Sequence, residues 1–207
     1  MTSSATRGDA AGRRRGRRPA KALLRRGYSL PEMLATLVVL GILSALVVPQ
    51  IEITRFRMDG AARGTLTALL AAQRSAVKHQ HDVVVVFDTV YFEILLHQDA
   101  NNNGLLDTGE RVRRVSLDDG VRFGLGAAPT RTASSAAISF TETQGGFPAV
   151  RFHRNGSASQ EGSVYLTSAR ALQGSGHAKD TRAVQVERAT GRASWYSYDP
   201  PVWRQGF

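Results

Sequence analysis

The sequence contains no cysteine among its 207 residues, so it has no disulfide framework, no thiolate metal site and no thiol nucleophile. It also lacks a phosphate-binding loop, a metallohydrolase helix and an arrangement of paired catalytic carboxylates. Acidic residues are few, because 17 Asp and Glu stand against 27 Lys and Arg, for a net charge of +10. The common enzyme signatures are therefore missing, and the positive charge is the first feature to explain.

The positive charge is concentrated at the N-terminus. Residues 1–26 hold nine Lys or Arg and one acid, Asp9, for a net charge of +8, whereas the remainder holds 18 basic and 16 acidic residues, a net of +2. A basic arm is not a basic domain, so the bulk charge does not predict nucleic-acid binding. Because the arm is rich in Arg, Ala, Gly and Ser without an apolar period, we expect it to be disordered.

A long hydrophobic run follows this arm. Residues 28–48 comprise 21 residues whose only charge is Glu32. As a helix they would span about 31 Å, close to the hydrocarbon thickness of a bilayer. The preceding arginines predict a cytoplasmic N-terminus and an extracytoplasmic remainder. A cleaved secretory signal is the alternative, but its apolar core would be shorter and would end at a small-residue site.

Glu32 is the anomaly of this run, because a carboxylate inside a membrane costs about 2.5–3.5 kcal/mol. One explanation is that the side chain reaches the interface from near the helix end. The other is that a cation pairs with it, since a paired buried charge is tolerated where a lone one is not.

The remainder of the chain predicts an α+β domain. Pro49 interrupts the helical pattern, and helical periodicity resumes over residues 52–80, so we expect one long helix kinked at Pro49. Its apolar stripe is predicted at Ala61, Ala62, Leu66, Leu69, Leu70, Gln73 and Val77. Antiparallel strands are predicted over 82–88, 90–97, 111–117, 121–125, 136–140, 149–153, 163–167, 183–188 and 193–198, with loops over 126–135 and 141–148. We expect the chain to divide into the basic N-terminal arm (1–27), the apolar helical segment (28–50), its amphipathic continuation (51–80) and a β-rich domain (81–207).

The stretch "GYSLPEMLATLVVLGIL" resembles the N-terminus of type IV pilins and type II secretion pseudopilins. Members of these families carry a basic leader ending in glycine, then an aromatic residue, Ser or Thr, Leu, often Pro, and Glu as the fifth residue after the cut. These positions are Gly27, Tyr28, Ser29, Leu30, Pro31 and Glu32. The usual aromatic is phenylalanine, so tyrosine is a conservative departure.

This resemblance implies a processing reaction and an ion pair. A prepilin peptidase would cut between Gly27 and Tyr28 and N-methylate the new amine of Tyr28. In the family, the counterpart of Glu32 pairs with the N-terminal amine of the neighbouring subunit as subunits enter the filament. The apolar residues after Glu32 would then pack inside that filament.

The rest of the chain resembles the GspH/FimT family of minor pseudopilins. The matching pieces are a helix followed by a strand pair, "DANNNGLLDTGERV", "VRFHRNGSAS" and "AVQVERATGRASWY", in that order. The resemblance implies a pilin-like α+β fold without enzymatic activity, in the inner membrane with a periplasmic C-terminal domain. The implied partners are prepilin peptidase, other major and minor pseudopilins, the inner-membrane assembly platform and membrane lipid.

Two alternative functions stay open. One is a type IV minor pilin involved in DNA uptake, which some FimT-type proteins support through a Gly-Arg-x-Arg segment. Here Arg192 is present but Ser194 replaces the second arginine, so nucleic-acid binding is not expected. The other is a membrane-anchored extracytoplasmic binding or enzyme domain, which would not be cut at Gly27.

The segment "DANNNGLLDTGE" spaces its oxygens as a calcium-binding EF-hand loop does. The six liganding positions fall on Asp99, Asn101, Asn103, the Leu105 carbonyl, Asp107 and Glu110. Gly104 occupies the sharpest turn. The flanking segments read as strands rather than helices, and a hairpin loop rich in Asn, Gly and Asp is the alternative. A structural calcium ion is therefore an expectation, and no other cofactor is expected.

Three further signals are given structural interpretations. His79 and His81 have no evident third metal ligand, so we expect a polar helix end. The "GSGH" stretch at 174–177 is predicted to be a loop. The C-terminal aromatic residues are predicted to lie in the core or at a subunit interface; these are Trp195, Tyr196, Tyr198 and Trp203.

Overall fold

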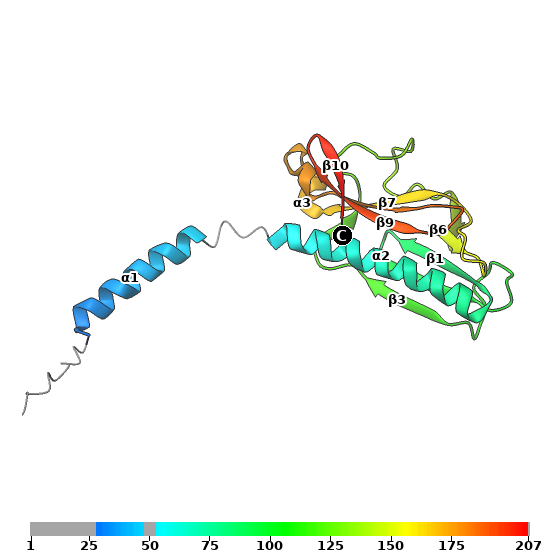
Figure 1. Cartoon of the computed structure of the whole chain (residues 1–207), viewed down its shortest axis with the longest axis horizontal. Coiled ribbons are helices and arrows are strands. Elements are labelled where there is room, and N and C mark those ends of the chain that lie inside the picture. The colour runs from blue at the N-terminus through cyan, green and yellow to red at the C-terminus, as the bar shows by residue number, and fades with distance from the viewer. Residues whose placement is uncertain (1–27, 48–52, 207) are drawn as a thin grey trace, which may run out of the picture. The chain divides into compact units, whose positions relative to one another are not determined.

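The computed structural model describes residues 28–47 and 53–206 (Figure 1). The chain divides into two compact units, Met1–Gln50 and Ile51–Phe207. The first unit contains helix α1, Leu30–Val47. The predicted kink at Pro49 lies outside the described residues.

Within residues 28–47 and 53–206, no helix combines the length and the hydropathy needed to cross a bilayer. The sequence predicts such a span over residues 28–48, and Val48 lies outside the described residues. The described helix covers 18 of those residues.

The second unit places one helix against two antiparallel sheets. Helix α2, Ile53–His79, precedes strands that form the sheet orders β3-β2-β1-β6-β5 and β10-β9-β8-β7-β4. The strands are β1 (Asp82–Asp88), β2 (Glu93–Asp99), β3 (Val112–Ser116), β4 (Val121–Phe123), β5 (Glu142–Gln144), β6 (Phe147–Phe152), β7 (Gly162–Ser168), β8 (Arg182–Val186), β9 (Ala193–Asp199) and β10 (Val202–Gln205). A short helix α3 (Ala169–Gln173) and a 3-10 segment η2 (Ser175–Asp180) connect β7 to β8. This arrangement confirms the α+β fold class.

Helix α2 contributes to one hydrophobic core together with both sheets. Its buried face consists mostly of small side chains, namely Met58, Ala61, Ala62, Thr65, Ala68, Leu69, Ala72 and Ala76. Small side chains let the helix backbone approach the sheets at close-packed density. The buried face is therefore rotated around the helix axis relative to the predicted stripe. Leu66 and Leu70 are only partly buried, and Val77 is 44% exposed.

Most predicted strands are found with shifted ends, but two predictions were wrong. Residues 136–140 form no strand and contribute an isolated bridge between Ile138 and Val164. The predicted loop at 141–148 contains β5 and the start of β6, which pair antiparallel. The turn between them is Gly145-Gly146, both with positive φ, a pair typical of a tight hairpin.

Candidate functional site

The segment implied to be processed begins at the edge of the described structure. Gly27 lies outside the described residues, and Tyr28 is 78% exposed. The Ser29 backbone N–H donates to Glu32 Oε2 at 3.4 Å, and the Ser29 carbonyl accepts from the N–H groups of Glu32 and Met33. Ser29 and Glu32 thus form part of a capping box, in which a Glu three residues after the cap satisfies the cap's own N–H. A Ser-x-x-Glu spacing before an apolar run is the sequence pattern that signals this contact.

Helix α1 presents an apolar surface all round. The large apolar side chains from Leu30 to Leu43 are each more than half exposed, at 52–85%. A helix that is hydrophobic on every face is normally buried in a core or in a membrane, and an exposed apolar patch of this kind marks an interaction site. Within α1 as the structure describes it, the one charged side chain is Glu32.

The Asp99–Glu110 loop brings its predicted ligand residues together. The Asp99 carboxylate, which is buried, accepts from the N–H groups of Asn103 at 3.0 Å and Gly104 at 2.7 Å. The side-chain amides of Asn101 and Asn103 donate to Asp107 Oδ2 at 2.7 and 2.6 Å. The loop is therefore closed by hydrogen bonds among the residues that the spacing singled out.

Glu110 closes the other side of this loop. Its carboxylate accepts from the N–H groups of Ala100 and Asp107, both at 2.9 Å, and lies 2.5 Å from His97 Nε2. These donors hold the pKa of Glu110 at about 2, below its ordinary 4.5. The largest effect on this pKa is the Asp107 N–H, followed by the bond from His97, while partial burial opposes them.

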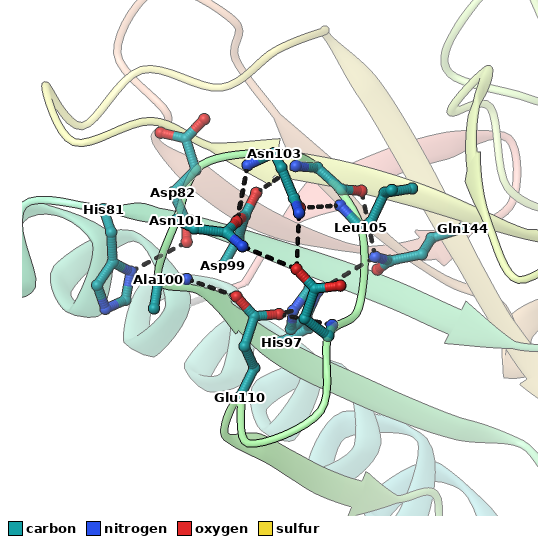
Figure 2. A network of polar contacts seen from close by, with 12 residues as sticks. His81, Asp82, His97, Asp99, Ala100, Asn101, Asn103, Leu105, Glu110 and Gln144 are labelled. Carbon is teal, nitrogen blue, oxygen red and sulfur yellow. Dashed lines mark hydrogen bonds and ion pairs between the residues drawn. The ribbon is translucent and has the colours of Figure 1, made fainter.

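His97 and Gln144 anchor the loop to the sheet, and sequence reasoning did not find either residue (Figure 2). The Gln144 amide N lies 3.2 Å from His97 Nδ1 and 3.5 Å from the Gly104 carbonyl. Because a carbonyl can only accept, this amide nitrogen is the donor to both atoms. His97 Nδ1 is then an acceptor, and its Nε2–H donates to Glu110.

The loop crosses one face of the first sheet. His97 on β2 lies opposite Val84 on β1, and Val84 lies opposite Arg151 on β6, so these three side chains share a face. Gly104 has φ +77°, and a Cβ there would lie 2.9 Å from the Arg151 guanidinium. Because Gly104 lies over Arg151 and contacts Gln144 on β5, the loop spans the sheet from β2 to β5.

The donor set of this loop suits a hard cation, since it offers three carboxylates, two amide oxygens and a carbonyl. Within the described ranges, however, no three His, Asp or Glu side chains are grouped to hold a metal ion. The carboxylate oxygens accept hydrogen bonds from N–H groups instead, as described above.

His79 and His81 stack on each other, and their Nδ1 atoms contact Ser75 and the Asp82 carbonyl.

Two glycine turns far apart in the sequence lie against each other. Gln73 on α2 donates from Nε2 to the carbonyls of Gly156 at 2.8 Å and Thr190 at 2.7 Å. Gly191 has φ +62°, and a Cβ there would lie 2.1 Å from the Gly156 carbonyl oxygen. The two segments therefore meet at one buried point, to which α2 is also bonded.

The C-terminal aromatic residues pack within the domain. Trp195 is 5% exposed, and Trp203 packs on Tyr165 and Tyr198 with ring centroids 6.0 and 5.2 Å apart. Tyr196 carries the Arg131 guanidinium on its ring face. These contacts confirm a core role for Trp195. The Arg192 side chain, the residue considered for nucleic acid, is exposed.

The family described as "Type II transport protein GspH" matches residues 61–190, more than half of the chain. The chain belongs to this GspH family. No curated protein sequence matches it. Two solved structures of the minor pseudopilin EpsH from the Type 2 Secretion System of Vibrio cholerae are similar, at 11% and 10% identity. They cover 70% and 73% of this chain and 99% and 94% of their own chains, with TM-scores of 0.46 and 0.38.

The part matched by the GspH family contains the loop over the first sheet and the turns bonded to Gln73. It does not contain Glu32, which precedes it, or Arg192, which follows it. The family assignment therefore rests on the helix-and-sheet domain alone.

Proposed function

We propose that this GspH-family protein is a minor pseudopilin of a type II secretion machine. It is an assembly subunit rather than an enzyme, and it works at or near the tip of a short pseudopilus. The observation that carries this proposal is α1, whose apolar side chains are exposed on all faces beside one carboxylate. Such a helix needs a surrounding of other apolar helices.

Processing supplies the cation that Glu32 needs as a partner. Prepilin peptidase cuts between Gly27 and Tyr28, and the N-methylated amine of Tyr28 is then a cation close to Glu32 in sequence. In the assembled pseudopilus this amine pairs with Glu32 of the neighbouring subunit, which offsets the desolvation of both charges. The capping contact to Ser29, at 3.4 Å, is long enough to be replaced by such a partner.

Before assembly the subunit resides in the inner membrane as a single-pass protein. The basic arm supports this orientation, since nine Lys or Arg precede the apolar segment and hold the N-terminus in the cytoplasm. The helix-and-sheet domain then lies in the periplasm, where it meets other pseudopilins. The assembly platform and lipid are its partners on the membrane side.

Two substitutions of Glu32 test this function. Glutamine keeps the capping contact, because either Glu or Gln serves at this helix position, but it removes the negative charge. We expect both Glu32→Gln and Glu32→Ala to be cleaved normally and to abolish secretion of exported proteins. Normal secretion by Glu32→Gln would show that the residue caps the helix and has no role as a charge.

Further experiments separate this function from the DNA-uptake pilin and from the membrane-anchored binding domain. A DNA-uptake pilin predicts DNA retention by the purified protein that Arg192→Ala abolishes, together with unchanged secretion in a deletion strain. A membrane-anchored binding domain predicts a chain that keeps residues 1–27. The GspH match favours the secretion subunit over both.

We also propose that the Asp99–Glu110 loop takes a structural calcium ion. The residues that would hold it are Asp99, Asn101, Asn103, the Leu105 carbonyl, Asp107 and Glu110, a set of oxygen donors that hard cations prefer. Calcium would stiffen the loop across the sheet. Its binding is measured by titration calorimetry on the purified protein after treatment with a chelator.

A further inference from the structure

Strand β3 is an edge strand of the first sheet (Figure 1). It pairs with β2 along one side, from Glu93 opposite Ser116 to His97 opposite Val112. In the described part of the chain no strand pairs with its other side. An edge of this kind is a template onto which another extended segment can add.

The register shows which backbone groups face outward. Gln98 N–H donates to the Arg111 carbonyl, and Leu117 N–H donates to the Phe92 carbonyl, each at 3.0 Å. In an antiparallel ladder the residues that bond to the partner alternate with residues that face away. Arg111, Arg113, Val115 and Leu117 therefore face β2. The N–H and carbonyl groups of Val112, Arg114 and Ser116 point outward.

The side chains along this edge are strongly basic. Arg111, Arg113 and Arg114 are all exposed. One acid compensates for them on the neighbouring strand, because Glu93 lies 3.5 Å from Arg114, whose side chain remains 68% exposed. The exposed acids Asp118 and Asp119 follow only after the strand has ended.

These charges indicate what can pair with the edge. A second copy of this chain is disfavoured, because antiparallel pairing of two β3 edges would set arginine against arginine. An acidic segment is favoured, because Glu or Asp directly opposite Arg111, Arg113 and Arg114 would form cross-strand ion pairs. The arginines therefore favour an acidic partner segment, and the outward backbone groups of β3 supply the hydrogen bonds that bind it.

A groove at the end of β3 offers a place for one side chain of the added strand. It has a volume of about 90 Å³ and is lined by α2 and by residues 115–118. Gly60 and Gly64 leave it open, since a Cβ on either would meet nothing within 4 Å. Thr65 also lines it, is 1% exposed, and has an Oγ1 without a hydrogen-bond partner.

We propose that the β3 edge binds an extended acidic segment of another subunit of the secretion pseudopilus by strand addition. The segment bonds to the backbone of Val112, Arg114 and Ser116, its acids pair with the arginines, and one side chain enters the groove beside Thr65. The choice of a pseudopilus subunit as partner rests on the proposed function. The binding chemistry itself does not.

A peptide titration tests the binding chemistry. The probe is a short fluorescent peptide with the pattern Val-Glu-Glu-Val-Glu, which in antiparallel pairing sets Glu opposite Arg114, Arg113 and Arg111. It is added to the purified full-length protein, and its anisotropy gives the affinity. We expect binding that weakens with salt and is lost when Lys replaces Glu in the peptide. Replacing Arg111, Arg113 and Arg114 by Gln should weaken binding at least tenfold. Equal binding of both peptides would overturn the proposal.

A matched pair of variants isolates the backbone contact. Ser116→Pro removes an outward N–H without removing a backbone bond to β2, whereas Ser116→Ala keeps that N–H. Both variants lose the hydroxyl that donates to Glu93 Oε1 at 3.0 Å, so this loss cancels in the comparison. We expect the proline variant to bind the acidic peptide about fivefold more weakly than the alanine variant, as for one lost hydrogen bond. Equal affinities would mean that the arginines only protect the edge from aggregation.

Secretion by the same two variants tests the partner. We expect Ser116→Pro to lower secretion relative to Ser116→Ala while cleavage at Gly27 stays normal. Weaker peptide binding with unchanged secretion would overturn the assignment of the edge to a pseudopilus subunit. If cleavage and the effect of Glu32→Gln on secretion were both absent, the proposed function would fail while the peptide result stood.

Discussion

Arg182 Nε donates to Asp59 Oδ1 across 2.6 Å and joins the first half of α2 to strand β8. The Arg182 side chain is 2% exposed, and its Nη1 donates to the carbonyls of Lys179 and Thr181. A buried guanidinium of this kind is tolerated because each of these contacts compensates for lost water. The pair therefore fixes where the helix lies on the second sheet.

Removing this ion pair should destabilise the domain. Asp59→Ala leaves a buried charge without its carboxylate, and we expect the free energy of unfolding to fall by about 1–3 kcal/mol. Arg182→Ala removes a large buried side chain as well, and about 3–5 kcal/mol is expected. Denaturant unfolding measures both. Asp59→Asn, which keeps an acceptor oxygen, is the control and should lose less than Asp59→Ala.

The contact between the two glycine turns makes Gly191 intolerant of a side chain. A Cβ at Gly191 would meet the Gly156 carbonyl oxygen at 2.1 Å in a backbone with φ +62°. Gly109 also has positive φ, at +98°, but nothing lies within 4 Å of a Cβ there. We expect Gly109→Ala to cost about 1 kcal/mol of strain and Gly191→Ala to cost clearly more. Equal losses in thermal unfolding would show that the turns do not press on each other.

The stability contributed by Glu110 should disappear in acid. Its pKa is about 2 in the folded protein and 4.5 ordinarily, so its contribution is complete above pH 4.5 and is lost as the pH falls toward 2. We expect the difference in unfolding free energy between wild type and Glu110→Gln to be constant above pH 5 and to shrink below it. A difference that does not change with pH would contradict this.

Asp180 also contributes stability that is lost in acid, but this contribution is the same in wild type and Glu110→Gln. Burial raises its pKa, but hydrogen bonds from Arg170 and Ser168 outweigh burial and lower the pKa below its ordinary value. Both proteins contain this carboxylate, so their difference reports Glu110.

Calcium should stabilise the loop over the first sheet. We expect an excess of calcium to raise the Tm of the wild type and a chelator to lower it again, because an ion bound only to the folded state adds to its stability. Asp107→Asn keeps the size of the side chain but removes one negative charge, so its Tm should respond less. A wild-type Tm that calcium does not change would leave the loop closed by hydrogen bonds alone.

Local patterns predicted most of the fold. Short runs rich in β-branched and aromatic residues identified β1, β7 and β8, because such residues suit a buried, pleated strand. The same reasoning missed β5, although Gly145-Gly146 signals a hairpin. It also placed the buried face of α2 on the larger side chains, whereas the helix packs against the two sheets mainly through its alanines.

The loop over the first sheet shows where local reasoning ends. The spacing from Asp99 to Glu110 singled out side chains that hydrogen-bond within one loop; that they bind calcium stays a prediction. It did not indicate His97 or Gln144, because their meeting depends on the pairing of β2, β1, β6 and β5. In the same way, no local pattern joins Gln73 to two turns more than eighty residues away.

On the proposed function, Glu32 awaits a cation that cleavage between Gly27 and Tyr28 creates. The most direct measurement is the mass of the intact N-terminus of the membrane-extracted protein, by mass spectrometry, with and without the host's prepilin peptidase. We expect a chain that begins at N-methylated Tyr28 only when the peptidase is present. A chain that keeps residues 1–27 in both strains would contradict it, and Glu32 would remain a helix cap.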